Sequence, residues 1–366
     1  MDKEMIGLIC KVTATTSAGL FAGSGLGSNF TTMPAMLKIE DTSALRVGWK
    51  HHFLLGKKYM GRCAQLSFLA GCSTCYLDTT ETKYYWLAGA FCMFFIFPFT
   101  AIVMMPDIQK LLKDDVIATR GVDWVRSSIN TWDKRHFKRS MASTIGFGIF
   151  LYALYNRQYH PSLDHLMGLI EARCSTENGD GPSFSICSNI YRSLHCLAHL
   201  HSLHSVNNME KEMVGEICKV SATAFCGLFA GSALGSNYTT MPALMKIEDT
   251  SALRVGWKHH FLLGAKMMPC LALGSMLSGG VACYLDNTDA KYYWLAGAGC
   301  MAFILPYTKA VMLSDIHKLL KDDVIEERGA DWVRENINTW DKRHFVRSMA
   351  STVGFGIFLY ALYNRK

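Results

Sequence analysis

The phrase TWDKRHFKRS at residues 131–140 carries three side chains whose spacing suits chemistry, and it recurs as TWDKRHFVRS at residues 339–348. On a continuous helix Trp132, His136 and Arg139 fall at positions i, i+4 and i+7, so they share one face. A histidine can exchange a proton near neutral pH, and an arginine can hold an anion by charge-assisted hydrogen bonds. A purely structural interpretation stays open, because aromatic and basic residues at a membrane boundary are ordinary anchors.

A second phrase, RVGWKHHFLLG, stands at residues 46–56 and is repeated intact at residues 254–264. Trp49 and His52 share a helical face in it. Asn29 ends a glycine-rich stretch upstream. If the three segments meet at one end of a helix bundle, their side chains form a small polar pocket with aromatic walls.

The candidate site takes equivalent residues from both occurrences of these phrases. The predicted catalytic residues are His136, Arg139, His344 and Arg347. The predicted substrate-binding residues are Asn29, Trp49, His52, Trp132, Asn237, Trp257, His260 and Trp340, and we expect Tyr85 to add to the pocket wall. Two histidines raise the question of a metal, but no third ligand stands at ligand spacing, so we expect neither a metal nor another cofactor.

The elements that position these residues are predicted to be membrane helices. Half of the 366 residues are hydrophobic and only 18% are charged. Windows of about 18–25 residues with almost no charge are long enough to cross a bilayer as helix, for example residues 12–34, 84–105 and 140–156. Helices are expected because backbone polar groups inside lipid must be satisfied within the segment. The fold class is therefore all-α and integral to the membrane.

The chain contains one unit twice. Residues 1–157 align without a gap on residues 209–365, and 115 of the 157 positions are identical. The predicted domains are copy one at residues 1–158 and copy two at residues 209–366. A linker rich in Ser, His and Cys joins them at residues 159–208. Residues 57–74 hold 12 of the 42 differences, so we expect that stretch to face lipid over much of its surface.

Each copy is expected to form a four-helix transmembrane bundle, which makes about eight spans. The predicted spans are residues 9–31, 60–79, 84–105 and 140–157 in copy one and 217–239, 268–287, 292–313 and 348–365 in copy two. Gly19, Gly23 and Gly27 recur at every fourth position, which lets another helix approach closely. The motif GSGLG does not indicate a nucleotide site, because no strand precedes it. The two copies are candidates to pack on each other.

The distribution of Lys and Arg predicts the orientation. The loop between spans one and two and the loop between spans three and four carry most of the basic residues, so both should be cytosolic, with the termini and the linker on the luminal or external side. The net charge of +7 sits beside the spans, which favours membrane lipids over nucleic acid as a partner. The organelle does not follow from these features.

The order GLFAGSGLGSNFTTMPAML, RVGWKHHFLLG, YYWLAGAFCMFFIFPFTAIVMMPDIQKLL and INTWDKRHFKRS resembles the anthrone oxygenase-like family, also known as a membrane domain of unknown function. The resemblance covers each copy over nearly its whole length. It implies a small four-helix membrane protein, and for some members oxidation of anthrones to anthraquinones by O2 without a recognised cofactor. Copy two departs from the pattern, with Ser314 in place of Pro106 and Lys309 within its third span, which puts activity of copy two in doubt.

Two function classes stay open. The first is cofactor-independent oxidation by O2 of a flat, lipophilic, anthrone-like aromatic molecule, with the histidine as base and the arginine or Asn29 holding the oxyanion. The second is a non-catalytic membrane scaffold or lipid-binding protein, so the residues alone do not decide whether the chain is an enzyme. A transporter is disfavoured, because no acidic residue is convincingly buried in mid-span.

Overall fold

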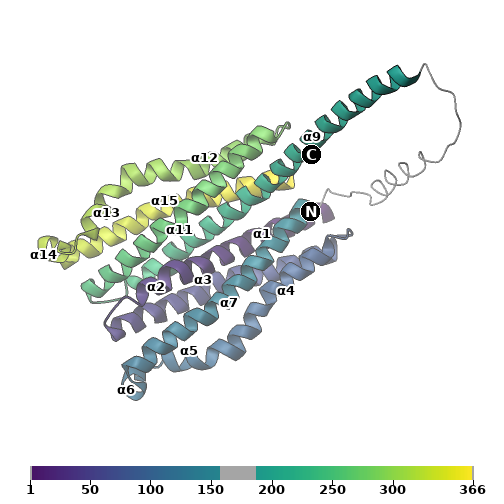
Figure 1. Cartoon of the computed structure of the whole chain (residues 1–366). Helices are drawn as coiled ribbons and strands as arrows, with labels where there is room; N and C mark the ends of the chain where they lie inside the picture. Colours follow the sequence, from purple (N-terminus) through teal and green to yellow (C-terminus); the bar gives the residue numbers. More distant parts are fainter. Residues whose placement is uncertain (1, 157–186, 365–366) are drawn as a thin grey trace.

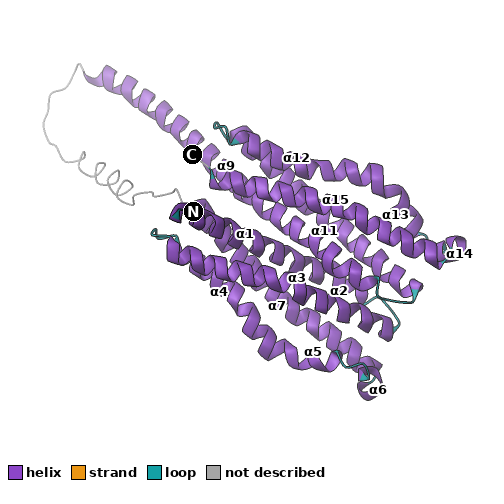
Figure 2. Cartoon of the chain, turned by 180° about the vertical axis from the view of Figure 1, so that it is seen from behind, coloured by secondary structure: helices purple, strands orange, loops and turns teal. Residues whose placement is uncertain are grey.

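The computed structural model of the chain describes residues 2–156 and 187–364, and for residues 187–210 it describes the backbone only. Within these ranges every regular element is helical (Figure 2). The prediction of an all-α protein is confirmed. No side chain of the Ser/His/Cys-rich linker at residues 159–208 is among those described. The backbone from Cys187 onward belongs to helix α9.

Copy one consists of four long helical rods joined by short turns. In chain order the elements are α1 (Lys3–Gly27), η1 (Ser28–Thr32), α2 (Met33–Met36), α3 (Thr42–Leu77), α4 (Lys83–Phe99), η2 (Thr100–Met104), α5 (Met105–Leu111), α6 (Val116–Arg120) and α7 (Val122–Tyr155). The elements η1 and η2 are π-helical turns that continue the rods begun by α1 and α4. Gly121 separates α6 from α7 at a φ of 85°, a conformation that side chains with a Cβ rarely adopt.

Copy two repeats this order. Its elements are α9 (Cys187–Gly235), η4 (Ser236–Thr240), α10 (Met241–Leu244), α11 (Thr250–Leu285), α12 (Lys291–Tyr307), η5 (Thr308–Met312), α13 (Leu313–Leu320), α14 (Val324–Arg328) and α15 (Ala330–Tyr363). Ser314, which replaces Pro106, leaves the start of α13 where α5 starts in copy one. In each copy the four rods contact one another in a closed ring, so each copy is a four-helix bundle.

The two bundles lie side by side, with their first rods in contact (Figure 1). The glycine face of α1 meets the same face of α9. A Cβ on Gly23 would stand 2.3 Å from the carbonyl oxygen of Leu228, and one on Gly231 would stand 2.4 Å from that of Leu20. Real Cβ atoms do not approach a carbonyl oxygen so closely, so both positions require glycine. The predicted small-residue face is therefore the seam between the copies.

A second contact between the copies is made by the short helices α2 and α10, which follow the first rod of each copy. Helix α2 packs mainly on α11 of the other copy, and α10 packs mainly on α3. At the centre of this exchange Thr32 and Thr240 share a hydrogen bond of 2.9 Å. Each α3 or α11 helix, which carries one WKHHF segment, is thus braced by the opposite copy.

Six helical rods among the described residues are long and apolar enough to span a membrane. They are Lys3–Met36, Lys83–Leu111, Lys211–Leu244, Thr250–Leu285, Lys291–Leu320 and Ala330–Tyr363. The chain is therefore a multi-pass membrane protein. Helices α3 and α7 pack as their counterparts α11 and α15 do. However, α3 carries more charge than α11, and α7 has Lys138 beside its apolar stretch where α15 has Val346, so the total of eight spans stays a prediction. Large apolar side chains such as Phe91 (67% exposed) and Ile102 (74% exposed) face outward from the third rod, where lipid would cover them.

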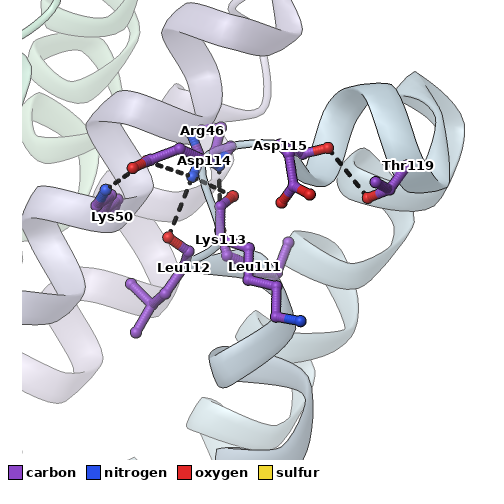
Figure 3. Close-up of polar contacts among 8 residues, drawn as sticks. All are labelled: Arg46, Lys50, Leu111, Leu112, Lys113, Asp114, Asp115 and Thr119. Atoms are coloured by element: carbon purple, nitrogen blue, oxygen red, sulfur yellow. Dashed lines mark hydrogen bonds and ion pairs between the residues drawn. The ribbon is translucent and has the colours of Figure 1, made fainter.

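At the end of copy one opposite the N-terminus, Arg46 ties α3 to the end of α5 (Figure 3). Its guanidinium donates hydrogen bonds to the carbonyl oxygens of Leu111 (3.1 Å), Leu112 (3.2 Å) and Lys113 (2.5 Å) at and just beyond the C-terminus of α5, where carbonyl groups lack intrahelical partners. Asp114 accepts from Lys50 at 2.8 Å and from Arg46 at 3.1 Å, and these hydrogen bonds lower the pKa of its carboxyl group.

Several basic residues of the two segments that are predicted to be cytosolic loops form hydrogen bonds within the protein. Arg46 is buried, and we call its hydrogen bonds to Leu111, Leu112 and Lys113 the Arg46 clamp. Arg126 donates to the carbonyl oxygens of Leu37, Ile39 and Glu40 and holds the turn between α2 and α3. The Arg46 clamp and the hydrogen bonds of Arg126 fix the position of α3 along α7. They therefore also fix the position of His52 relative to His136.

Candidate functional site

The π-helical turn η1 places two adjacent polar side chains against two different helices. A π-turn inserts an extra residue into a helix, and such turns are frequent at functional sites. The Oγ of Ser28 lies 3.0 Å from Nε2 of His52 on α3. Its neighbour Asn29 reaches α7 and contacts Asp133 and His136. Ser28 and Asn29 therefore bring the WKHHF and TWDKRHF segments together, as the sequence predicts.

Asn29 is held by Asp133 in one orientation. Its amide nitrogen donates to the backbone oxygen of Asp133 at 3.1 Å and to the carboxylate Oδ1 at 2.7 Å. Both partners accept hydrogen bonds, so the amide oxygen of Asn29 must point the other way. There it meets Ser140 Oγ at 2.7 Å and His136 Nδ1 at 3.1 Å.

This arrangement selects the tautomer of His136. An amide oxygen can only accept, so the hydrogen bond requires a proton on Nδ1 of the imidazole. In the neutral ring Nε2 then carries the lone pair. Within the described residues Nε2 makes no hydrogen bond to protein, and the imidazole lines a cavity. The geometry leaves His136 as an oriented base with its free nitrogen available to a ligand.

Arg139 lines the same cavity without a strong partner. Its Nε–H is enclosed and donates to no acceptor in the described part of the chain. The one hydrogen bond recorded for its terminal nitrogens runs to the sulfur of Met104 at 4.0 Å, and thioether sulfur is a weak acceptor. Leaving a largely enclosed guanidinium without an anion costs free energy, which is recovered when an anionic oxygen binds.

The aromatic residues form a wall and the layer behind it. The Trp132 ring lies 4.8 Å from the ring of His136 and 6.4 Å from that of His52. Trp132 lines the cavity, whereas Trp49 is fully buried behind it, edge-on at 5.9 Å. Trp257 lies behind Trp340 in the same way in copy two.

The cavity of copy one has a volume of about 450 Å³, within the range usual for small-molecule sites. Buried residues of α1 and α4 form its closed side, among them Phe21, Ser24 and Ile96. Its open side carries exposed residues of α3. The cavity also contains Thr239 of copy two, whose backbone interacts with His52, so the other copy contributes to this wall.

Copy two builds the same cluster around a smaller cavity of about 250 Å³. His344 Nδ1 lies 3.1 Å from Asn237 Oδ1, and Ser348 Oγ lies 2.6 Å from it. The Nε of Arg347 is again enclosed and has no hydrogen-bond partner among the described residues. Thr31 of copy one joins this cavity, as Thr239 joins the first. His260 is held through Ser236 at 3.0 Å.

One expectation about the pocket is wrong. Tyr85 stands at the start of α4, at the opposite end of the bundle, where it packs on Tyr152 at 5.0 Å. The expectation that residues 57–74 face lipid over much of their surface stays a prediction, and part of this stretch also lines the cavity, namely Lys57, Lys58, Gly61, Arg62 and Gln65. Leu66 and Leu69 of the same stretch do face outward, 51% and 58% exposed.

Ser28, Asp133 and Ser140 are site residues that the sequence analysis does not identify. Ser140 follows His136 by one helical turn, a signal that spacing alone offers. Asp133 lies off the face of His136 on α7 and joins the cluster only through Asn29. No group of three or more His, Cys, Asp or Glu side chains suited to a metal ion occurs among the residues described here.

A family model described as anthrone oxygenase matches the chain twice, at residues 49–149 and 257–357. The two matches together cover more than half of the 366 residues. The chain belongs to the anthrone oxygenase family. Both matches run from the tryptophan of the WKHHF segment to the fourth rod, so each includes a complete histidine pair and its arginine. No curated protein and no solved structure matches the chain.

Proposed function

We propose that this anthrone oxygenase family member oxidises a flat, lipophilic substrate that carries an acidic methylene group beside a carbonyl, as an anthrone does. The observation that carries the proposal is the pairing of an oriented base with an unpaired cation in one cavity. His136 presents its free Nε2, and Arg139 presents a guanidinium that has no acidic partner among the described residues. A substrate that loses a proton and gains an oxyanion needs both groups.

The chemistry proceeds in three steps. His136 Nε2 removes a proton from the methylene carbon, and the electron pair moves onto the carbonyl oxygen, which Arg139 holds. The resulting carbanion reduces O2 and forms a C–O bond, and the peroxide takes the proton back from the imidazolium. Loss of water then converts the hydroperoxide into a ketone. In sum, one CH2 group and one O2 give one C=O group and one water.

The surroundings suit a lipophilic substrate. Trp132 offers a flat face beside His136, and Phe21, Phe97 and Ile96 supply apolar walls. We further propose that the cavity opens near the cytosolic face of the membrane, since the basic residues of α3 and α7 gather at that level. Asp133 keeps Asn29, and through it His136, in the competent orientation.

The test is oxygen consumption and quinone formation from emodin anthrone by the purified full chain after chelation of metals. The variant His136→Gln with His344→Gln should fold and insert normally but lose turnover above the spontaneous background. Turnover that survives in this variant would exclude the histidines as bases. No turnover by well-folded wild-type protein would favour a scaffold or lipid-binding role.

A further inference from the structure

The two cavities share their chemical cluster but differ at their open side. Lys57 and Arg62 line the cavity of copy one, whereas Ala265 and Cys270 stand at the equivalent positions of copy two. Lys58 also lines the first cavity, while its counterpart Lys266 does not line the second. The first cavity therefore has three cations at its mouth in addition to Arg139.

No acidic side chain of the described residues pairs with these three cations. No ion pair is recorded for Lys57, Lys58 or Arg62 within the described residues, and no acidic side chain lines the cavity. The Nζ atom of Lys58 lies 5.1 Å from the ring centroid of Tyr59. All three are exposed, which places them at the entrance rather than at the closed side. The entrance of copy one thus has a concentrated positive charge beside an apolar interior.

In copy two the entrance changes in both charge and shape. Pro269 replaces Gly61 and Leu273 replaces Gln65, and the volume falls from about 450 to about 250 Å³. The second cavity gains one cation from a different element, because Lys309 of η5 lines it at the position where copy one has Ala101. The copies thus diverge around an identical histidine, asparagine and arginine cluster.

We infer that the cavity of copy one selects a flat aromatic ligand that carries an anionic group, whereas the cavity of copy two does not share this selectivity. The apolar body of the ligand lies between Trp132 and Phe97, and its carboxylate remains at the mouth beside Lys57 and Arg62. This inference rests on the proposed function for the identity of the ligand body, but binding needs no turnover.

The experiment measures equilibrium binding of two probes to the full chain in phosphatidylcholine nanodiscs. The probes are anthraquinone-2-carboxylate and its neutral analogue 2-methylanthraquinone, followed by quenching of tryptophan fluorescence. We expect the carboxylate to bind one site per chain about tenfold more tightly than the neutral probe, a preference of the size that a few partly exposed charges provide. In Lys57→Ala with Arg62→Ala this preference should disappear while binding of the neutral probe is unchanged.

The control variant is Lys134→Ala with Lys138→Ala. It removes two exposed cations of α7 that do not line the cavity. The preference should survive in it. Equal affinity of both probes for the wild type, or equal loss of preference in the control, would overturn the inference. The inference would also be overturned if a few per cent of phosphatidylglycerol in the nanodisc abolished the preference for the carboxylate probe. The mouth of the cavity would then be a binding site for lipid headgroups. A binding preference without turnover would refute the oxygenase and leave this inference standing.

Discussion

The hydroxyl oxygens of Thr32 and Thr240 lie 2.9 Å apart, so two equivalent residues of the two copies form a hydrogen bond with each other. One residue before them in each copy, Thr31 and Thr239 each line the cavity of the opposite copy. The copies are therefore parts of one assembly in which each site is completed from the other side. A tandem chain of this kind supplies the second half of the assembly without a second molecule.

The first prediction concerns this assembly. When residues 1–158 and 209–366 are expressed as two separately tagged chains in the same cells, we expect them to co-purify in mild detergent. The seam buries a glycine face and an exchanged helical segment, and such close packing drives association of membrane helices. Two halves that purify as independent monomers with intact tryptophan environments would contradict the shared seam.

The second prediction concerns the glycine seam. Gly23→Ala with Gly231→Ala should lower the free energy of unfolding by about 1–3 kcal/mol per site, because each new methyl group meets a backbone oxygen that cannot move away. Thermal unfolding followed by tryptophan fluorescence measures the effect.

Gly7→Ala with Gly148→Ala is the matched control, since no atom lies within 4 Å of either new Cβ. The control should match the wild type or exceed it, because alanine favours helix over glycine. An equal loss in both variants would contradict close packing at the seam as the cause, because the control glycines have no neighbour within 4 Å.

Helix periodicity and charge predict most of the fold. The tandem repeat, the helical class and the approach of Trp132 and His136 to His52 all follow from local spacing and from the need to satisfy the backbone inside lipid. The glycine period predicts a close helix contact, although only the structure identifies the partner as the same face of the other copy.

The rest depends on details that spacing does not carry. A π-helical turn changes the register by one residue, so the meeting of Asn29 with Asp133 cannot be predicted from an ideal helix. Arg46 resembles a loop cation in sequence, yet it caps a helix end in the interior. Lys57 and Arg62 differ between the two copies, and such differences are expected both on a lipid-facing surface and in a pocket whose specificity has diverged. The sequence alone does not separate these two interpretations.

The third prediction concerns the orientation of the base. Asn29→Leu with Asn237→Leu keeps the side-chain volume but removes the oxygen that accepts from Nδ1 of His136 and His344. We expect kcat for emodin anthrone to fall about 10–100-fold, as when a supporting hydrogen-bond partner of a functional histidine is lost. Steady-state oxygen uptake separates this loss from a change in KM.

The control for that experiment is Ser67→Ala with Ser275→Ala. It removes one buried hydrogen bond per copy, to Ala14 and Ala222 respectively, away from the cavity. It should lower stability by about 0.5–1.5 kcal/mol and leave kcat unchanged. Wild-type kcat in the folded asparagine variant would show that the base needs no orienting partner.

The last prediction concerns the ion pair at the opposite end of copy one. Lys11 and Asp78 lie 2.7 Å apart, both nearly buried. Burial by itself would raise the pKa of Asp78, but hydrogen bonds from Lys11 and Thr80 outweigh it and lower that pKa to about 2.

A carboxyl group whose pKa is lowered in the folded state stabilises the fold at any pH above its unfolded-state pKa of about 3.9. It loses that contribution as the pH falls towards 2. Because water screens part of the pair at the membrane boundary, we expect about 1 kcal/mol. Thermal unfolding of the wild type and of Asp78→Asn should therefore differ at pH 6 and converge between pH 4 and pH 2. A difference that stays constant over this range would mean that the variant acts through packing and not through the charge of Asp78.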